Sequence, residues 1–408
     1  MTQENTQETA GCPLHFDHYD YALQDDPYPV YARLRREAPL YHNEEHDFWV
    51  MSRHRDIHKA FRTDGVYSNK MGVSLDASAW NPQAHVVMSF LGMDPPEQTR
   101  LRKLVSRGFT PKRVAGMESQ IRRLCNLYLE PALRRGSFDW IVDFAGKFPM
   151  DVISELLGVP PADRDELRRL ADLLVHREHG LRDVPPVGFE ASMALFSYYG
   201  DLIAERRRRP GDDLVTALLT TEGDDGDRMT DGELTAFLFL MVVAGNETTT
   251  KLLGNAVHNL TRHPEQLAAV FADASLVSPW IEETLRYDAS SQLLARHTLE
   301  DVTVDGVTCP AGSQLLLNIG SANHDEQVFA ESEEYDVFRD RDELAKHIAF
   351  GGGRHFCLGA NLARLEANIA LEELVSRCRT IETLPGAQRF YSANVRGFSS
   401  LPVTVALR

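Results

Sequence analysis

The stretch FGGGRHFCLGANLAR, residues 350–364, places one cysteine behind three glycines and ahead of a predicted helix. Glycines at 351–353 let the backbone turn tightly and approach a flat ligand. A helix N-terminus lowers the pKa of a thiol and directs backbone N–H groups at the sulfur. The pattern therefore indicates either a thiolate that binds a metal or a buried structural cysteine. We predict that Cys357 starts this helix, because apolar residues recur after it at helical spacing, at Leu358, Leu362, Leu365 and Ile369.

The composition is that of an ordinary globular protein. The 408 residues are 43% hydrophobic and 25% charged. The sequence shows no run of about 18 apolar residues and no basic-then-apolar N-terminal signal. We therefore expect a cytoplasmic monomer without a membrane span, formed by a single domain over 1–408 with a flexible tail over 1–20. The net charge of -17 argues against nucleic-acid binding, because phosphate affinity needs clustered cations.

Most of the chain has helical periodicity, with a smaller β-rich portion near 30–70 and 295–320. Residues 48–52 (FWVMS) are typical of a strand, and 301–320 predicts hairpin strands around the Asp305-Gly306 turn. The five cysteines form no CxxC or Cys/His cluster, which argues against a disulfide framework and a zinc site. The fold class is predicted to be mainly α.

One predicted helix is unusually long. Thr230 and Glu233 form a T-x-x-E capping box, and apolar residues continue from 234 to 260. Roughly 30 residues would span about 45 Å, which predicts a central, buried helix. Its middle, AGNETTT at 244–250, interrupts the apolar run with a glycine and a carboxylate, both costly there. This stretch is either a functional site or a helix bend with a back-bonded threonine and a carboxylate at a surface cleft.

Four motifs together identify a family. Phe350, Gly353, Cys357 and Gly359 fill the pattern F-x-x-G-x-x-x-C-x-G, which resembles the haem-binding loop of the cytochrome P-450 family, soluble bacterial type. Residues 244–249 resemble its oxygen-activating helix, 282–286 (EETLR) its E-x-x-R motif, and 93–111 the helix that crosses the haem face. The resemblance runs from 26–41 to 395–403. It implies the P-450 fold, with haem buried between the long central helix and the helix after the cysteine loop.

The resemblance also implies haem b as cofactor, O2 as co-substrate and Cys357 as the axial thiolate on the iron. Charged and polar residues match the positions that hold the haem propionates, and their types suit anionic groups. Many family members have histidine where Gln98 stands. The propionate contacts implied are Gln98, Arg102, Arg296 and His355, and further cofactor contacts are Ala244, Gly245, Phe350, Gly351 and Gly359.

The implied activity is monooxygenation, either hydroxylation or epoxidation. Thr248 is implied to hydrogen-bond the activated oxygen, and Glu247 with ordered water to supply protons. Asn246 fills a variable position whose role is open. A peroxide-driven peroxygenase and a non-catalytic haem sensor are the alternatives. A structural ion network that supports the haem loop is implied for Glu283, Arg286 and Arg339.

The implied substrate is a hydrophobic molecule, such as a steroid, terpenoid, macrolide or fatty acid, of the kind met in bacterial secondary metabolism. No GxGxxG nucleotide motif or flavin domain is present, so electrons are expected from a separate ferredoxin and an NAD(P)H-driven ferredoxin reductase. Cations behind the cysteine, including Lys103 and Arg113, would steer an acidic ferredoxin. Besides variable regions near 70–90 and 170–190, the implied pocket residues are Leu240, Val243, Ala244, Gln292, Leu293, Leu294, Asn394 and Val395.

Overall fold

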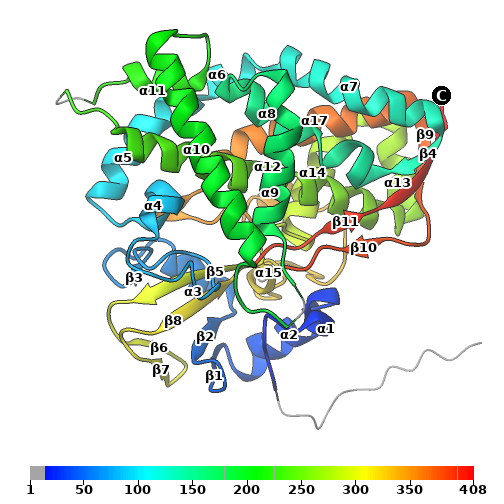
Figure 1. Cartoon of the computed structure of the whole chain (residues 1–408). Helices are drawn as coiled ribbons and strands as arrows, with labels where there is room; N and C mark the ends of the chain where they lie inside the picture. Colours follow the sequence, from blue (N-terminus) through cyan, green and yellow to red (C-terminus); the bar gives the residue numbers. More distant parts are fainter. Residues whose placement is uncertain (1–13, 179, 224–225, 393) are drawn as a thin grey trace, which may run out of the picture.

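The computed structural model describes residues 14–178, 180–223, 226–392 and 394–408. Helices make up most of the molecule, and one β-sheet lies along one side of them (Figure 1). The predicted class, mainly α with a smaller β-rich portion, is confirmed. Of the tail expected over 1–20, residues 1–13 lie outside the described residues, whereas Phe16 and His18 are buried. Those two side chains therefore belong to the packed body.

The helices run through the chain from end to end. Their bounds are α1 (Tyr21–Asp25), α2 (Tyr28–Glu37), α3 (His54–Ala60), α4 (His85–Met88), α5 (Glu97–Ser106), α6 (Pro111–Ala115), α7 (Glu118–Arg135), α8 (Phe148–Leu157), α9 (Arg164–Val175), α10 (Pro186–Arg208), α11 (Leu214–Thr220), α12 (Asp231–Thr261), α13 (Pro264–Ala272), α14 (Val277–Tyr287), α15 (Ile319–Ala322), α16 (Arg341–Leu344) and α17 (Ala360–Arg377). None of the helices described combines the length and apolar character that crossing a membrane requires.

The strands form one larger sheet and three small ones. The larger sheet has the order β1-β2-β8-β5-β3, with β2 and β8 parallel and the other neighbours antiparallel. The small sheets are β4-β12-β9, β10-β11 and β6-β7. The strand bounds are β1 (Leu40–Asn43), β2 (Phe48–Met51), β3 (Tyr67–Ser68), β4 (Ser137–Asp139), β5 (Leu293–Thr298), β6 (Val302–Val304), β7 (Val307–Cys309), β8 (Gln314–Asn318), β9 (Cys378–Thr383), β10 (Gln388–Arg389), β11 (Phe398–Ser400) and β12 (Pro402–Leu407).

The long helix α12 crosses the helical body (Figure 1). Thr230 is its N-cap, and both hydrogen bonds of the capping box with Glu233 are present. The helix runs for 31 residues without a break, which corresponds to about 46 Å. Most of its side chains are buried, including polar ones such as Thr250, which donates to the carbonyl of Ala145 at 2.8 Å. The sequence-based expectation of a central buried helix is confirmed.

The predicted hairpin forms only in part. Asp305 and Gly306 have φ angles of 48° and 83°, the left-handed pair that a tight two-residue turn requires, and they join β6 to β7. Strand β8 lies within the same predicted segment but leaves the hairpin. It is inserted between β2 and β5 in the larger sheet. The sheet is therefore assembled from segments that lie far apart in the sequence.

Candidate active site

The loop before α17 holds Cys357 in a conformation that its glycines make accessible. Gly351 and Gly353 have φ angles of 69° and 59°. A Cβ atom on Gly353 would also lie 1.9 Å from the carbonyl oxygen of Phe61, so no larger residue fits. The backbone N–H of Cys357 donates to the carbonyl of Phe350 at 3.0 Å and closes the loop. The helix begins at Ala360, three residues later than predicted, because Gly359 acts as its N-cap.

The Cys357 thiol is accessible on one side, yet the surrounding protein crowds it. Burial raises the pKa of this thiol, and the backbone N–H groups of Gly359 and Ala360 together with Arg102 oppose that rise. The N–H groups at the start of the helix thus act on the thiol in the expected direction, while burial acts against them. A Cβ atom on Gly359 would meet nothing within 4 Å, so the space beside this glycine, two residues after the cysteine, is open.

Three cationic or polar side chains near the cysteine lack an anionic partner. Arg296 is 3% exposed, donates to the carbonyl of Ala295 at 2.8 Å, and has its pKa lowered to about 10 by burial. His355 Nδ1 and Arg102 Nη1 are buried without a hydrogen-bond partner. Burial, followed by the charges of Arg296 and Arg102, lowers the pKa of His355 to about 3. Such a cluster fits a ligand that carries carboxylates, as the two propionates of haem do.

Gln98 has a different task in this structure. Its side chain is 1% exposed, and its Nε2 donates to the carbonyl of Arg354 at 3.0 Å. The amide nitrogen therefore holds the cysteine loop against α5. Its contact with a propionate stays a prediction.

Helix α12 presents an accessible stripe in the middle of its buried length. Leu240, Ala244 and Thr248 are spaced one helical turn apart, and each is partly or fully exposed while most neighbouring residues are buried. The Thr248 hydroxyl donates to the carbonyl of Ala244 at 2.7 Å, which leaves the hydroxyl oxygen free to accept. α12 contacts α17 directly, and Leu240 and Phe350 of the cysteine loop pack against the same core cluster. The stripe and the cysteine loop thus belong to one interior region.

The residues beside the stripe are buried. Glu247 is 7% exposed, and its Oε2 lies 3.1 Å from Lys251 Nζ in an ion pair. Of the alternative to a functional site, the back-bonded threonine is present at Thr248, but Glu247 does not reach a surface cleft, because the lysine one turn later partners it inside the protein. A Cβ atom on Gly245 would lie 2.9 Å from Ile153 on α8. The glycine therefore allows close packing of α12 against α8.

The E-x-x-R residues form a complete buried network. Glu283 and Arg286 are both fully buried and make two hydrogen bonds of 2.7 Å with each other. Arg286 also donates to backbone carbonyls of three residues in 323–334. Arg339 joins the network with its Nε 3.3 Å from Glu283 Oε2. The three side chains tie α14 to the segment that leads into the cysteine loop.

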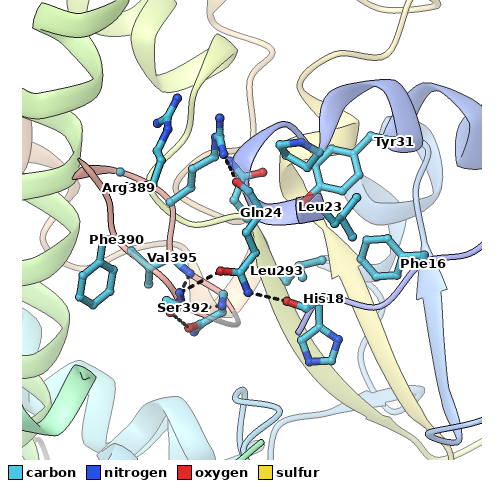
Figure 2. Close-up of a pocket in the computed structure, with 15 residues that line it drawn as sticks. Phe16, His18, Leu23, Gln24, Tyr31, Leu293, Arg389, Phe390, Ser392 and Val395 are labelled. Atoms are coloured by element: carbon cyan, nitrogen blue, oxygen red, sulfur yellow. Dashed lines mark hydrogen bonds between the residues drawn. The ribbon is translucent and has the colours of Figure 1, made fainter. Parts of the chain in front are cut away.

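The expected substrate residues lie in three places. Leu240, Val243 and Ala244 lie on or beside the α12 stripe. Gln292, Leu293, Asn394 and Val395 instead line a cavity of about 30 Å³ between the N-terminal segment and the β10-β11 region, where Figure 2 shows Leu293 and Val395 beside Gln24. Leu293 is buried with Phe16, and Gln292 Nε2 donates to the carbonyl of Ala289. Leu294 packs on the opposite side, against the cluster that contains Phe61.

Two residues next to the site are absent from the sequence-based assignment. Lys251 partners Glu247, and Asp172 on α9 lies within electrostatic reach of both. The spacing i, i+4 between Glu247 and Lys251 is a visible signal in the sequence. Nothing in the sequence brings Asp172 to them.

A cysteine loop that faces a central helix, with unpaired cations beside it, defines a protein of the haem-thiolate class. The family model Cytochrome P450 matches residues 188–389. The putative cytochrome P450 123 of Mycobacterium bovis is 53% identical over 396 residues, which cover 97% of this chain and 98% of that protein. The vitamin D(3) 25-hydroxylase of Pseudonocardia autotrophica is 37% identical over 409 residues, which cover 98% of each chain.

Comparison of the fold with solved structures also finds cytochrome P450 proteins. The structure of cytochrome P450 CYP109Q5 from Chondromyces apiculatus matches with a TM-score of 0.86 and 34% identity, over 96% of this chain and 98% of that one. The chain belongs to the cytochrome P450 family. It is accordingly a monooxygenase with haem b as cofactor and O2 as co-substrate, and the unpaired cations beside Cys357 fit that cofactor.

Proposed function

We propose that this protein inserts one atom of O2 into a hydrophobic small molecule, with electrons from a ferredoxin and an NAD(P)H-driven ferredoxin reductase in the cytoplasm. Bound haem supplies the iron that binds and activates O2. The observation that carries the proposal is the accessible Thr248 hydroxyl on an otherwise buried helix, with the Glu247 carboxylate on the preceding residue, buried in an ion pair with Lys251. A hydroxyl that accepts hydrogen bonds and a carboxylate that moves protons are the groups such a reaction needs.

Each residue of the proposed site has a task of its own. Cys357 holds the iron through its sulfur, and Arg102, Arg296 and His355 hold the propionates. Gln98 holds the cysteine loop in place through the Arg354 carbonyl. The Thr248 hydroxyl oxygen accepts a hydrogen bond on the side of α12 where O2 would bind. The hydroxyl itself donates to the Ala244 carbonyl at 2.7 Å. Leu240, Val243 and Ala244 exclude water and contact the substrate.

The thiolate assignment is tested by the spectrum of the reduced protein with carbon monoxide. A strongly red-shifted Soret band is expected in the wild type, and Cys357→His should lose it. A histidine-type carbonyl spectrum in the wild type would overturn the assignment. A difference-spectral screen of steroids, terpenoids, macrolides and fatty acids would then identify the substrate class.

Thr248 distinguishes a monooxygenase from its two rivals. In Thr248→Ala, haem and substrate binding are expected to remain, while NADPH consumption continues with peroxide released and less product formed. Glu247→Gln should instead slow the whole cycle. The measurement is product and peroxide per NADPH consumed. Unchanged coupling in Thr248→Ala would remove the catalytic role, and efficient turnover with added peroxide regardless of Thr248 would favour the peroxygenase.

Several of the cations that were expected to bind ferredoxin already have acidic partners within this protein. Arg100, Arg354 and Arg364 make ion pairs with Asp227, Asp64 and Glu282, respectively. Lys103 on α5 and Arg113 on α6 are the test residues, because neither is assigned a contact with haem. Reversing both charges should slow reduction by ferredoxin and weaken its dependence on salt. If rate and salt dependence stay unchanged, ferredoxin docks elsewhere.

A further inference from the structure

A large cavity, here called the outer cavity, lies where three segments that are far apart in the sequence meet at the surface. Its volume is about 550 Å³, within the range of about 300–1,000 Å³ found for sites that bind small molecules. Residues of the N-terminal segment 15–24 line one side, residues 177 and 180–182 of the loop between α9 and α10 another, and residues 391–392 near β10 a third. In Figure 1 this green loop reaches the blue N-terminal helices.

The outer cavity is separate from the place where the reacting molecule is expected. Of the segments expected around that molecule, only the variable region near 170–190 contributes to the described lining. The outer cavity shares Gln24 and Ser392 with the small cavity of about 30 Å³. Gln24 Oε1 accepts from the Ser392 backbone N–H at 3.2 Å, and Gln24 Nε2 donates to the carbonyl of His18 at 2.7 Å (Figure 2). These hydrogen bonds hold a wall between the two cavities.

Aromatic rings give the outer cavity its apolar surfaces. The rings of Tyr21 and Tyr391 have centroids 4.2 Å apart and are tilted by 55°. The ring of Tyr19 is covered on one side by the Arg182 guanidinium, 5.5 Å from its centroid. Leu181 and Tyr391 are 38% and 39% exposed, although both are large apolar side chains. Such side chains around a concave surface supply the contact area that a ring-shaped ligand needs.

The charged side chains of the lining already have partners within the protein. Arg177 makes two hydrogen bonds with the buried carboxylate of Asp76, at 3.0 and 2.8 Å. Arg182 Nη2 donates to Asp17 at 3.1 Å. Asp20 is the N-cap of α1 and accepts a backbone N–H of its first turn at 2.9 Å. A charged ligand would have to displace these partners, whereas a neutral ring system needs only the apolar surfaces.

We propose that the outer cavity is a binding site for one neutral molecule of fused rings with few polar groups, such as a steroid. The rings of this molecule pack against Tyr19, Tyr21 and Tyr391, and Leu181 contacts it from the loop between α9 and α10. The site is occupied whether or not a second molecule is bound on the haem side. It goes beyond the proposed function, because binding in the outer cavity requires no turnover.

The site is tested with the haem-loaded protein and testosterone, a neutral steroid, as the probe. Equilibrium dialysis counts all the bound steroid, and the difference spectrum of the haem counts the steroid bound on the haem side. We expect one equivalent of bound testosterone beyond the number that the spectrum reports. Equal numbers from the two measurements would overturn the proposal.

Two variants locate the extra equivalent. Replacing both rings of the pair, Tyr21→Ala with Tyr391→Ala, should weaken its binding at least about tenfold. Ala22→Trp should abolish it by filling the cavity from α1, with both rings kept. Ala194→Trp is the matched control, because Ala194 is an exposed alanine of α10 outside the lining, and it should leave the extra equivalent unchanged. Extra binding that survives both the double variant and Ala22→Trp would contradict the outer cavity as its place.

The class of ligand is tested by its charge. Testosterone sulfate has the same rings with a negative charge and should bind the outer cavity at least about tenfold more weakly, because the arginines are already paired. Binding of testosterone itself should be the same at about 0.05 and 0.5 M salt. Tighter binding of the sulfate, or a salt-dependent affinity for testosterone, would overturn the neutral class. If testosterone leaves the haem spectrum unchanged, the proposed function fails for that probe, while dialysis of the wild type and the variants still decides the outer cavity.

Discussion

Two buried arginine clusters in this protein differ in what completes them. Arg286 is fully buried and has a carboxylate partner, Glu283, together with three backbone carbonyls. Arg296 is buried to almost the same extent, yet it donates to the backbone carbonyl of Ala295, and the nearby His355 Nδ1 has no partner. The first cluster is satisfied by the chain and holds the fold. The second needs anionic groups from outside, which haem propionates supply.

The largest effect is expected from breaking the complete cluster. Glu283→Gln removes the negative charge and leaves Arg286 and Arg339 buried without it. The expected loss is about 3–5 kcal/mol, out of a typical total stability of about 5–15 kcal/mol. Urea unfolding of the haem-loaded protein measures it. Glu343→Gln is the control, because Glu343 partners Arg339 from a more exposed position and should cost far less. Equal losses of stability in the two variants would show that the burial of Glu283 does not determine how much it stabilises the fold.

The incomplete cluster should respond with the opposite sign. Without haem, Arg296→Met removes a buried cation that has no carboxylate bonded to it, so the haem-free protein is expected to gain about 1–4 kcal/mol of stability. The same variant should lose haem faster to apomyoglobin. Both quantities are measured on one preparation, by urea unfolding and by haem transfer. A haem-free protein destabilised by Arg296→Met would mean that the chain itself satisfies this arginine.

An intermediate effect is expected from Glu282, which links α14 to α17. It accepts hydrogen bonds from Arg364 at 2.7 and 2.8 Å and lies 3.0 Å from His347. Although burial opposes them, Arg364 and His347 lower the pKa of Glu282 to about 2. A lowered pKa gives stability that is present above about pH 4.5 and is lost as pH falls toward 2.

Glu282→Gln should therefore cost about 1–2 kcal/mol near neutral pH, after allowance for its partial exposure. The difference from the wild type should shrink between pH 4.5 and pH 3 in urea unfolding. A constant difference across that range would mean that the ionised form of Glu282 is not what joins α14 to α17.

The smallest effect is expected at the rim of the cysteine loop. Arg354 and Asp64 form an exposed ion pair, with 47% and 59% of their side chains accessible. Water and salt screen such a pair. Asp64→Asn should leave the urea midpoint and the rate of haem loss unchanged within error. A clear change in either quantity would show that the incomplete cluster around Arg296 and His355 extends to this surface ion pair.

Features with local causes could be predicted from the sequence. The start of α12 depends on Thr230 and Glu233, which contact each other across one turn. The β6-β7 turn depends on Asp305 and Gly306 themselves. The cysteine pattern at 350–359 could be recognised because it, too, depends only on residues that are close together in the sequence. Positive φ angles at its glycines are a property of the residue type.

Other features depend on contacts between distant parts of the chain. Gln98 donates to the Arg354 carbonyl, 256 residues away, and its contact with a propionate stays a prediction. Gln292 and Leu293 line the small cavity beside the N-terminal segment, and their place beside the substrate stays a prediction. Gly245 packs against Ile153 on α8, a contact that spacing along the chain does not indicate.

The sequence by itself determined the type of chemistry, because a cysteine loop, a threonine beside a carboxylate and an E-x-x-R pair are short patterns of chemically distinctive residues. Only the tertiary structure decided which groups are paired. Lys251 is buried against Glu247 and Glu283 against Arg286, whereas Arg296 is buried without a carboxylate bonded to it. Desolvation acts on the final packed positions of side chains, and spacing along the chain does not contain those positions.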